Sequence, residues 1–312
     1  MKKIVLCIAL ISSFLVTGCM EGEWIQNMIV EDTGDMNYNR TMKQDLLCLM
    51  MAYPEDITNI EKGEDGRVYI VMKSGRKILY DDKRRKNHKQ KLANPDLQDM
   101  MEQIYPLSRI DKLMDKDFDP GRVRVYPLFK EVYGKTKEEV QSKLISVKVG
   151  YKNYPFNENN RAAQNLKAAM GELILLAKNR PETYPFLFPA SGTFNYRYIS
   201  GTNRLSPHSF GIALDLKRDN RDYWKWASRE EGEKRLKSYP KEIVEALEKR
   251  NFIWGGKWGH FDILHFEYRP ELIIKSKYFS NESPLVKAWY SGVSPLDNKV
   301  MSYIQIIDRE LQ

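Results

Sequence analysis

Apolar positions recur most regularly between Asn157 and Lys178, at the spacing of three and four residues that places side chains on one helix face. That face consists of Ala162, Leu166, Ala169, Met170, Leu173, Ile174 and Ala177. Pro181 follows, and its fixed φ and missing N–H end a helix there. The pattern therefore predicts a long helix with its apolar face in the core. Shorter patterns predict helices over residues 40–52 and 240–250, and one more in the C-terminal tail.

Two further helices are predicted from residues that favour helix starts. In Asn94-Pro95-Asp96 the asparagine suits an N-cap, the proline the first turn and the aspartate the positive end of the helix dipole. A helix is therefore expected over residues 94–104. Thr136 and Glu139 have the spacing of a capping box, which predicts a helix that reaches about residue 145.

Other stretches read as strands and loops. Two β-rich runs, residues 67–72 and 76–80, surround the link Lys73-Ser74-Gly75 and predict a hairpin. A very basic loop follows over residues 83–91, and the aromatic, Gly-containing residues 186–199 predict strand and loop around a cleft. The remaining predicted strands are residues 146–149, 211–216 and 263–268.

Length and composition allow one packed domain with a smaller annex, because the chain has 312 residues and 42% of them are hydrophobic. No group of chemically active residues occurs before about residue 115, so the first part is expected to be accessory. The predicted division is a leader (1–18), a tether (19–39), an N-terminal accessory region (40–115), a main domain (116–282) and a C-terminal helical tail (283–312).

The N-terminus has the features of an export signal. Lys2 and Lys3 precede an apolar run, Ile4 to Val16, that is too short to span a bilayer. The following Thr17-Gly18-Cys19 completes a segment similar to a bacterial lipobox, in which Cys19 would carry lipid; an ordinary signal peptide is the alternative. We therefore expect an exported lipoprotein anchored in a membrane, the outer one where the organism has it, because Met20 and not Asp follows the cysteine.

The charge of the chain suits an anionic polymer or a membrane surface. The formal charge of +8 falls to +6 once Lys2 and Lys3 are removed with the leader. The basic run Lys83-Arg84-Arg85-Lys86 has no nucleic-acid-binding module beside it, so no nucleic-acid partner is expected. Cys48 would be the free cysteine left after lipidation, so we expect no disulfide and a buried thiol in an apolar run.

The candidate chemistry is concentrated in two short segments. Residues 206–215 contain His208 and Asp215, and residues 262–267 contain Asp262 and His265. Three of these four groups can hold a Zn²⁺ ion and leave one coordination position for water, which distinguishes hydrolytic from structural zinc sites. The fourth group would then act on the proton of that water.

The expected strands set geometric conditions for such a site. In a strand over residues 211–216, Gly211, Ala213 and Asp215 share one face, and the two small residues leave room beside the carboxylate. A turn just upstream would bring the ring of His208 back over that face.

The second segment sets a further condition. In a regular strand Asp262 and His265 would point to opposite faces, so Asp262 is expected to enter from the preceding loop. From there its carboxylate could reach water bound beside His265.

The pattern Ser-x-His-x-x-Gly-x-Ala-x-Asp, followed by Asp-x-x-His-Phe, resembles the M15 zinc peptidases. That family includes D-Ala-D-Ala carboxypeptidases and dipeptidases and phage L-alanyl-D-glutamate endopeptidases. The resemblance covers roughly residues 120–270 and includes Arg197, the Tyr-Gly-Lys-Thr segment and the Trp-Gly-Gly-x-Trp turn. It implies an α+β fold, with a small antiparallel sheet and flanking helices around a zinc site, like that of lysostaphin-type peptidases and the Hedgehog domain.

The resemblance also implies roles for individual residues. It makes His208, Asp215 and His265 the ligands of one zinc ion per chain and Asp262 the general base. Its candidates for holding substrate or the developing oxyanion are Ser206 and Arg197, and Trp258 is a further candidate for framing the cleft or contacting substrate.

Several residues have alternative interpretations. His260 could replace His265 as a ligand. Glu267 shares strand parity with His265 and could either orient that ring or form a structural salt bridge. Arg197 could pair with a core carboxylate, and His88, in a lysine-rich loop, has no evident partner.

Together with export and basic charge, the resemblance implies hydrolysis of an amide bond in peptidoglycan stem peptides by a lipid-anchored monomer. Many relatives have Glu where this chain has Asp262, and Asp occurs in the endopeptidase branch, which favours an L-alanyl-D-glutamate endopeptidase. A D-alanyl-D-alanine carboxypeptidase is the alternative, with Arg197 as a clamp for the free carboxylate. A non-catalytic, zinc-containing wall-binding module is the third hypothesis, and Asp262 argues against it because a binder needs no base.

Overall fold

The structure is a computed structural model that describes residues 35–280, 287–294 and 297–312. The leader, Cys19 and the tether up to residue 34 lie outside the described residues. Residues 35–39, which the sequence assigned to the tether, are helical and continue into the predicted helix that ends at residue 52. Among the helices of the described ranges, none is long and apolar enough to cross a bilayer.

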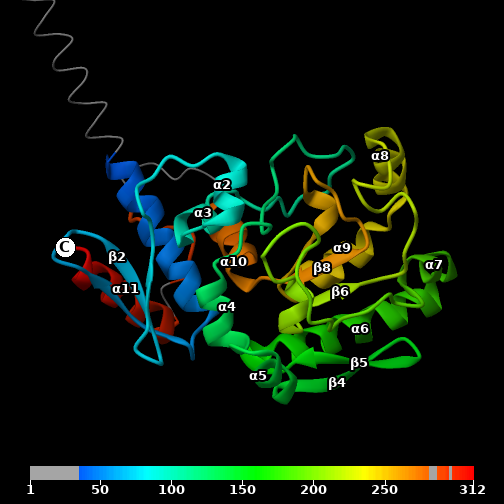
Figure 1. Cartoon of the computed structure of the whole chain (residues 1–312), viewed down its shortest axis with the longest axis horizontal. Coiled ribbons are helices and arrows are strands. Elements are labelled where there is room, and N and C mark those ends of the chain that lie inside the picture. The colour runs from blue at the N-terminus through cyan, green and yellow to red at the C-terminus, as the bar shows by residue number, and fades with distance from the viewer. Residues whose placement is uncertain (1–34, 281–286, 295–296) are drawn as a thin grey trace, which may run out of the picture.

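The N-terminal region is a three-stranded antiparallel sheet beside the helix of residues 35–52. Its strands are β1 (Ile57–Lys62), β2 (Val68–Met72) and β3 (Lys77–Leu79), in the order β1-β2-β3, so the predicted hairpin is confirmed. The C-terminal helix α11 (Asn298–Glu310) packs against β1 at the same end of the molecule (Figure 1). Lys43 Nζ also lies 2.7 Å from Asp308 Oδ1, so the accessory region and the tail pack together.

Helix starts in this region differ from the prediction. The expected basic loop contains α2 (His88–Ala93), and Asn94 ends that helix instead of capping the next. Asp96 caps α3 (Leu97–Met101), since its carboxylate accepts the N–H of Asp99 at 2.9 Å. The physical reason is that Asn94 is engaged at the end of α2, where its N–H donates to the carbonyl of Gln90, while Asp96 and Asp99 cap each other's N–H groups.

The predicted long helix begins later than expected. Residues Lys152–Asn157 form strand β5, paired with β4 (Leu144–Val149), and the helix α6 runs from Ala162 to Asn179 over this hairpin. Asn157 Nδ2 donates to the carbonyl oxygens of Tyr133 and Phe210 at 3.0 Å each, which ties the end of β5 to neighbouring loops. Helices and turns not yet given are α4 (Tyr126–Tyr133), α5 (Lys137–Ser142, capped by Thr136 as predicted), η1 (Asn159–Arg161), η2 (Pro181–Thr183), α7 (Tyr184–Leu187), α8 (Arg229–Ser238), α9 (Lys241–Glu248), η4 (Gly255–Lys257) and α10 (Pro270–Phe279).

A third small sheet lies at the centre of the molecule. Its strands β6 (Ala213–Asp215), β8 (His265–Tyr268) and β7 (Phe252–Trp254) are antiparallel in the order β6-β8-β7. Residues opposite one another in an antiparallel pair project to the same face. The register places Asp215 opposite His265, so pairing of β6 with β8 brings the two sequence segments together. The α+β class predicted from the sequence is confirmed.

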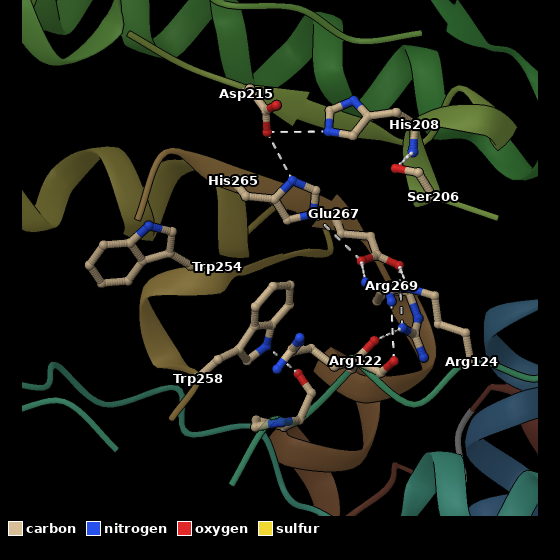
Figure 2. A network of polar contacts seen from close by, with 12 residues as sticks. Arg122, Arg124, Ser206, His208, Asp215, Trp254, Trp258, His265, Glu267 and Arg269 are labelled. Carbon is tan, nitrogen blue, oxygen red and sulfur yellow. Dashed lines mark hydrogen bonds and ion pairs between the residues drawn. The ribbon is translucent and has the colours of Figure 1, made fainter. Parts of the chain in front are cut away.

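The central strand β8 carries a buried network of charges. Glu267 accepts hydrogen bonds from Arg124 Nε at 2.8 Å and from Arg124 Nη2 at 2.5 Å, and Arg269 Nη1 lies 3.4 Å from the same carboxylate. Arg269 in turn pairs with Glu271, which accepts the hydroxyl of Tyr53 at 2.8 Å. The network therefore joins β8 to Arg124 in the loop before α4, as Figure 2 shows, and through Glu271 to Tyr53, directly after the N-terminal helix.

Replacing Glu267 by glutamine is expected to lower the free energy of unfolding by about 3–5 kcal/mol, because it leaves two buried guanidinium groups without their shared carboxylate. Urea unfolding of the two chains measures the difference. Glu230→Gln is the matched control, since Glu230 pairs with Lys234 on the exposed face of α8, and its unfolding midpoint should not change. Equal midpoints for all three chains would contradict a structural role for this network.

Candidate metal and catalytic site

His208, Asp215 and His265 converge at one edge of the central sheet. His265 Nδ1 lies 2.9 Å and His208 Nε2 3.2 Å from the same oxygen, Asp215 Oδ1 (Figure 2). One potential ligand atom from each residue lies within 4.8 Å of the other two. The side chain of Asp215 is 26% exposed, whereas the two imidazoles are 6% and 7% exposed, so solvent reaches the cluster over the carboxylate.

A single 3₁₀ turn, η3 (Pro207–Phe210), places His208 beside β6. Ser206 caps this turn by accepting the N–H of His208 at 3.4 Å. Gly211 ends it with φ +66, and its N–H donates to the carbonyl of His208 at 3.1 Å. The turn upstream of the strand is therefore as predicted.

The expected role of Gly211 is wrong. A Cβ at this position would lie 2.5 Å from Leu144 Cδ2, in a left-handed conformation that side chains avoid. Glycine is thus required by the backbone turn and by packing against β4, and it does not open space beside Asp215.

The tautomer of His208 is fixed by the chain itself. Its Nδ1 contacts the carbonyl oxygen of Thr193, which requires the proton on Nδ1 and leaves the electron pair on Nε2. His208 Nε2 is buried and has no hydrogen-bond partner among the described residues. A buried imidazole nitrogen with a free electron pair, beside a carboxylate and a second imidazole, is the donor set that suits Zn²⁺. The residues present therefore fit the ion that the sequence predicted.

Glu267 has both roles that the sequence left open: it forms a structural salt bridge and it lies beside the ring of His265. Its carboxylate forms the buried salt bridge with Arg124, and Glu267 Oε2 also lies 3.7 Å from His265 Nε2. The ring of His265 is thus held between Asp215 on its Nδ1 side and Glu267 on its Nε2 side. Trp258 packs beside the same ring, with centroids 5.6 Å apart.

The side chains of the cluster shift one another's protonation. Burial alone would raise the pKa of Asp215, but His208 and His265 hold it well below its usual range. Burial alone would lower the pKa of His265, yet its hydrogen bond with Asp215, together with Glu267, raises it to about 10. Negative charge at Asp215 is thus strongly favoured, as a cation site requires.

Asp262 enters the site from the loop before β8, as predicted, and not from the strand. Its backbone pairs with Tyr223 in an isolated bridge and donates to the carbonyl of Gly255 at 2.9 Å. The pKa of the Asp262 carboxyl is raised to about 7, chiefly by burial; the imidazole of His265 opposes this shift and the charge on Asp215 adds to it. A carboxyl group near Asp215 and His265 with this pKa can gain and lose a proton at neutral pH.

Arg197 does not pair with a core carboxylate among the described residues. Its side chain is exposed, and within the described ranges its guanidinium has no hydrogen bond or ion pair. Burial and the charge on Asp262 raise the pKa of Tyr223, and the guanidinium groups of Arg122 and Arg197 lower it. The Arg197 guanidinium is therefore available to a ligand, and its contact with substrate stays a prediction.

Ser206 and Trp258 are both 3% exposed. The hydroxyl of Ser206 is engaged at the start of η3, and Trp258 Nε1 donates to the carbonyl of Pro120 at 2.7 Å. Both residues thus support the site from within, and their contact with substrate stays a prediction.

The preference for His265 over His260 as a ligand agrees with the structure, whereas the expectation that His88 has no partner is wrong. His260 lies apart from the His208 cluster, because its Nδ1 is 2.7 Å from Asp119 Oδ2. His88 has partners after all, since its Nε2 is 3.1 Å from that same oxygen and its ring stacks on His260. The sequence could not show this contact, because α2 and the loop around Asp119 meet only in the folded chain.

Sequence reasoning missed other residues around the site. The carbonyl of Thr193 acts through the backbone and has no sequence signal. Arg122 was not singled out either, although its charge lowers the pKa of both Asp262 and Tyr223. Arg124 stood between two valines, and a charge in such an apolar context was a usable signal for a buried ion pair.

A buried His-Asp-His cluster with a further carboxyl of raised pKa beside it is the arrangement of a metal-dependent hydrolase. Residues 200–268, which include all four of these groups, match a peptidase M15 family described as D-alanyl-D-alanine carboxypeptidase. This segment is thus an M15 metallopeptidase domain with a candidate metal site at His208, Asp215 and His265. The match covers well under half of the chain, and no curated protein or solved structure matches the chain.

Proposed function

We propose that this protein hydrolyses an amide bond in peptidoglycan stem peptides with one catalytic zinc ion, as a D-alanyl-D-alanine carboxypeptidase. The observation that carries the proposal is the convergence of His208, Asp215 and His265 within the segment that matches the peptidase family. The family description favours the carboxypeptidase over the endopeptidase that the residue at position 262 suggested.

In the proposed site His208 Nε2, His265 Nδ1 and the Asp215 carboxylate would hold the ion. Bound zinc would lower the pKa of a coordinated water and polarise the amide carbonyl. Thr193 and Glu267 keep the two rings oriented, so each imidazole presents the required nitrogen without reorganisation.

Asp262 is the proposed proton carrier. Its carboxyl would accept a proton during attack on the amide and then donate it to the leaving amine. The buried position, which raises its pKa to about 7, suits both steps at neutral pH.

Arg197 is proposed to bind the terminal carboxylate of the substrate. In an Arg197→Ala chain, kcat/KM for a peptide ending in free D-Ala-D-Ala should fall about 10- to 100-fold, because a hydrogen bond to a charged group contributes roughly 1.5–3 kcal/mol. For the same peptide with an amidated C-terminus, Arg197→Ala should have the same kcat/KM as the parent chain, because this peptide has no terminal carboxylate to bind. Arg67→Ala, on the exposed N-terminal hairpin, is the control. Equal losses on both peptides would contradict the clamp.

The second candidate is an L-alanyl-D-glutamate endopeptidase, favoured by aspartate rather than glutamate at position 262. Purified sacculi and a synthetic stem pentapeptide separate the two activities by mass spectrometry of the products. Release of terminal D-alanine alone identifies the carboxypeptidase, and a new amino group within the stem identifies the endopeptidase. Intact substrates in the presence of zinc would contradict both.

We also propose that lipid on Cys19 holds the protein at a membrane close to its polymeric substrate. The support is the lipobox-like segment that ends in Cys19 and the basic balance of the chain. Cys19→Ala should move the protein from the membrane fraction to the soluble fraction, while Cys48→Ala should not, because Cys48 is buried in the core. Cells fractionated with and without these changes provide the measurement, and membrane retention of Cys19→Ala would refute the anchor.

A further inference from the structure

The four histidines of the chain are divided evenly between two clusters of the same composition. The second cluster is formed by His88 of α2, Asp119 of the loop before α4 and His260 of the loop before β8. None of these three residues lies within residues 206–215 or 262–267, the two segments that supply the ligands of the first site.

The two clusters match atom by atom. In the first, one carboxylate oxygen lies 2.9 Å from an imidazole Nδ1 and 3.2 Å from an imidazole Nε2. In the second, Asp119 Oδ2 lies 2.7 Å from His260 Nδ1 and 3.1 Å from His88 Nε2. His88 Nε2, like His208 Nε2, is buried and makes no hydrogen bond within the described residues. His88 Nε2 is thus a buried potential ligand atom beside Asp119 Oδ2 and His260 Nδ1.

The second cluster is also held in place by its surroundings. Asp119 is fully buried; its Oδ1 accepts the N–H of His260 at 2.9 Å, and its own N–H donates to Gln103 Oε1 at 2.7 Å. The rings of His88 and His260 are stacked with centroids 5.7 Å apart, and Trp224 packs edge-on against His260 at 4.7 Å. Such support orients ligands before a metal binds.

The charges around the cluster allow a cation. Arg122 Nη1 donates to Asp119 Oδ2 at 2.9 Å, and a carboxylate oxygen has room for one hydrogen bond and one further ligand. Asp117 Oδ1 lies 3.9 Å from His88 Nε2, so a second carboxylate stands on the same side. The nearby Lys86 is already neutralised by Asp96 and Asp99, at 2.7 and 2.6 Å.

We propose that His88, Asp119 and His260 bind a second divalent transition-metal ion. Two imidazoles and a carboxylate suit ions of the zinc class and do not suit Ca²⁺ or Mg²⁺, which prefer oxygen ligands alone. The ion would be structural. It joins α2 of the accessory region to the loop that carries Arg122 and to His260, two residues before Asp262, and so fixes the accessory region beside the first site.

Counting metal ions tests the proposal. The full chain is loaded with Zn²⁺, desalted and analysed for zinc per chain, together with His88→Ala, His208→Ala and the double variant. We expect two ions in the parent chain, one in each single variant and none in the double variant. Lys89→Ala, an exposed neighbour of His88 in α2, is the matched control and should keep both ions.

A second measurement distinguishes loss of the metal site from loss of folding. In the His208→Ala background, added Co²⁺ should give a visible d–d absorption that disappears when His88 is also replaced, while circular dichroism remains unchanged. If His88→Ala holds as many ions as the parent chain, or if the Co²⁺ spectrum does not depend on His88, the second site is refuted. Loss of an ion in His88→Ala but not in His208→Ala would support the second site and count against the proposed catalytic one, so the two hypotheses are separable.

Discussion

Asp262→Asn is expected to lower kcat about 10²- to 10⁴-fold and to leave the zinc content unchanged. Asparagine keeps the size of the side chain but cannot accept and return a proton, and general acid–base catalysis contributes a factor of this size. The measurement is D-alanine release from the stem pentapeptide, with zinc determined on the same preparation. Asp65→Asn, in the exposed turn of the N-terminal hairpin, is the control and should retain full activity.

The same variant separates an enzyme from a binding module. A non-catalytic wall-binding protein would bind sacculi equally well with aspartate or asparagine at position 262 and would show no turnover in either form. Normal turnover in Asp262→Asn would contradict the role of this residue and require a different proton acceptor near His265.

Removal of the metal is expected to abolish activity. A chelator should remove turnover from the parent chain, and added Zn²⁺ should restore it, since Lewis-acid stabilisation amounts to several kcal/mol and each 1.36 kcal/mol is tenfold in rate. His208→Ala should lose at least about 10³-fold in kcat/KM, and zinc should not restore it. Circular dichroism controls for unfolding. Activity that survives both chelation and His208→Ala would show that the hydrolysis does not use this site.

The local geometry of the site was accessible from the sequence. Alternation around Asp215 predicted a strand, Pro207 predicted the turn that carries His208, and strand parity predicted that Asp262 enters from a loop. All three depend on interactions between near neighbours along the chain, which residue type and spacing report well.

What was missed depends on contacts between distant segments. The long helix was predicted to begin at Asn157, but this residue ends β5 and donates hydrogen bonds to the carbonyl oxygens of Tyr133 and Phe210, so α6 begins only at Ala162. The salt bridge of Glu267 with Arg124 and the contact of His88 with Asp119 join residues that no spacing rule connects. Tertiary packing decided these cases over local preference.

The most direct test of the central claim is anomalous diffraction at the zinc absorption edge from crystals of the zinc-loaded chain. The account predicts an anomalous peak between His208 Nε2, His265 Nδ1 and the carboxylate of Asp215. The absence of a peak among these atoms, or either imidazole turned away from Asp215, would contradict it.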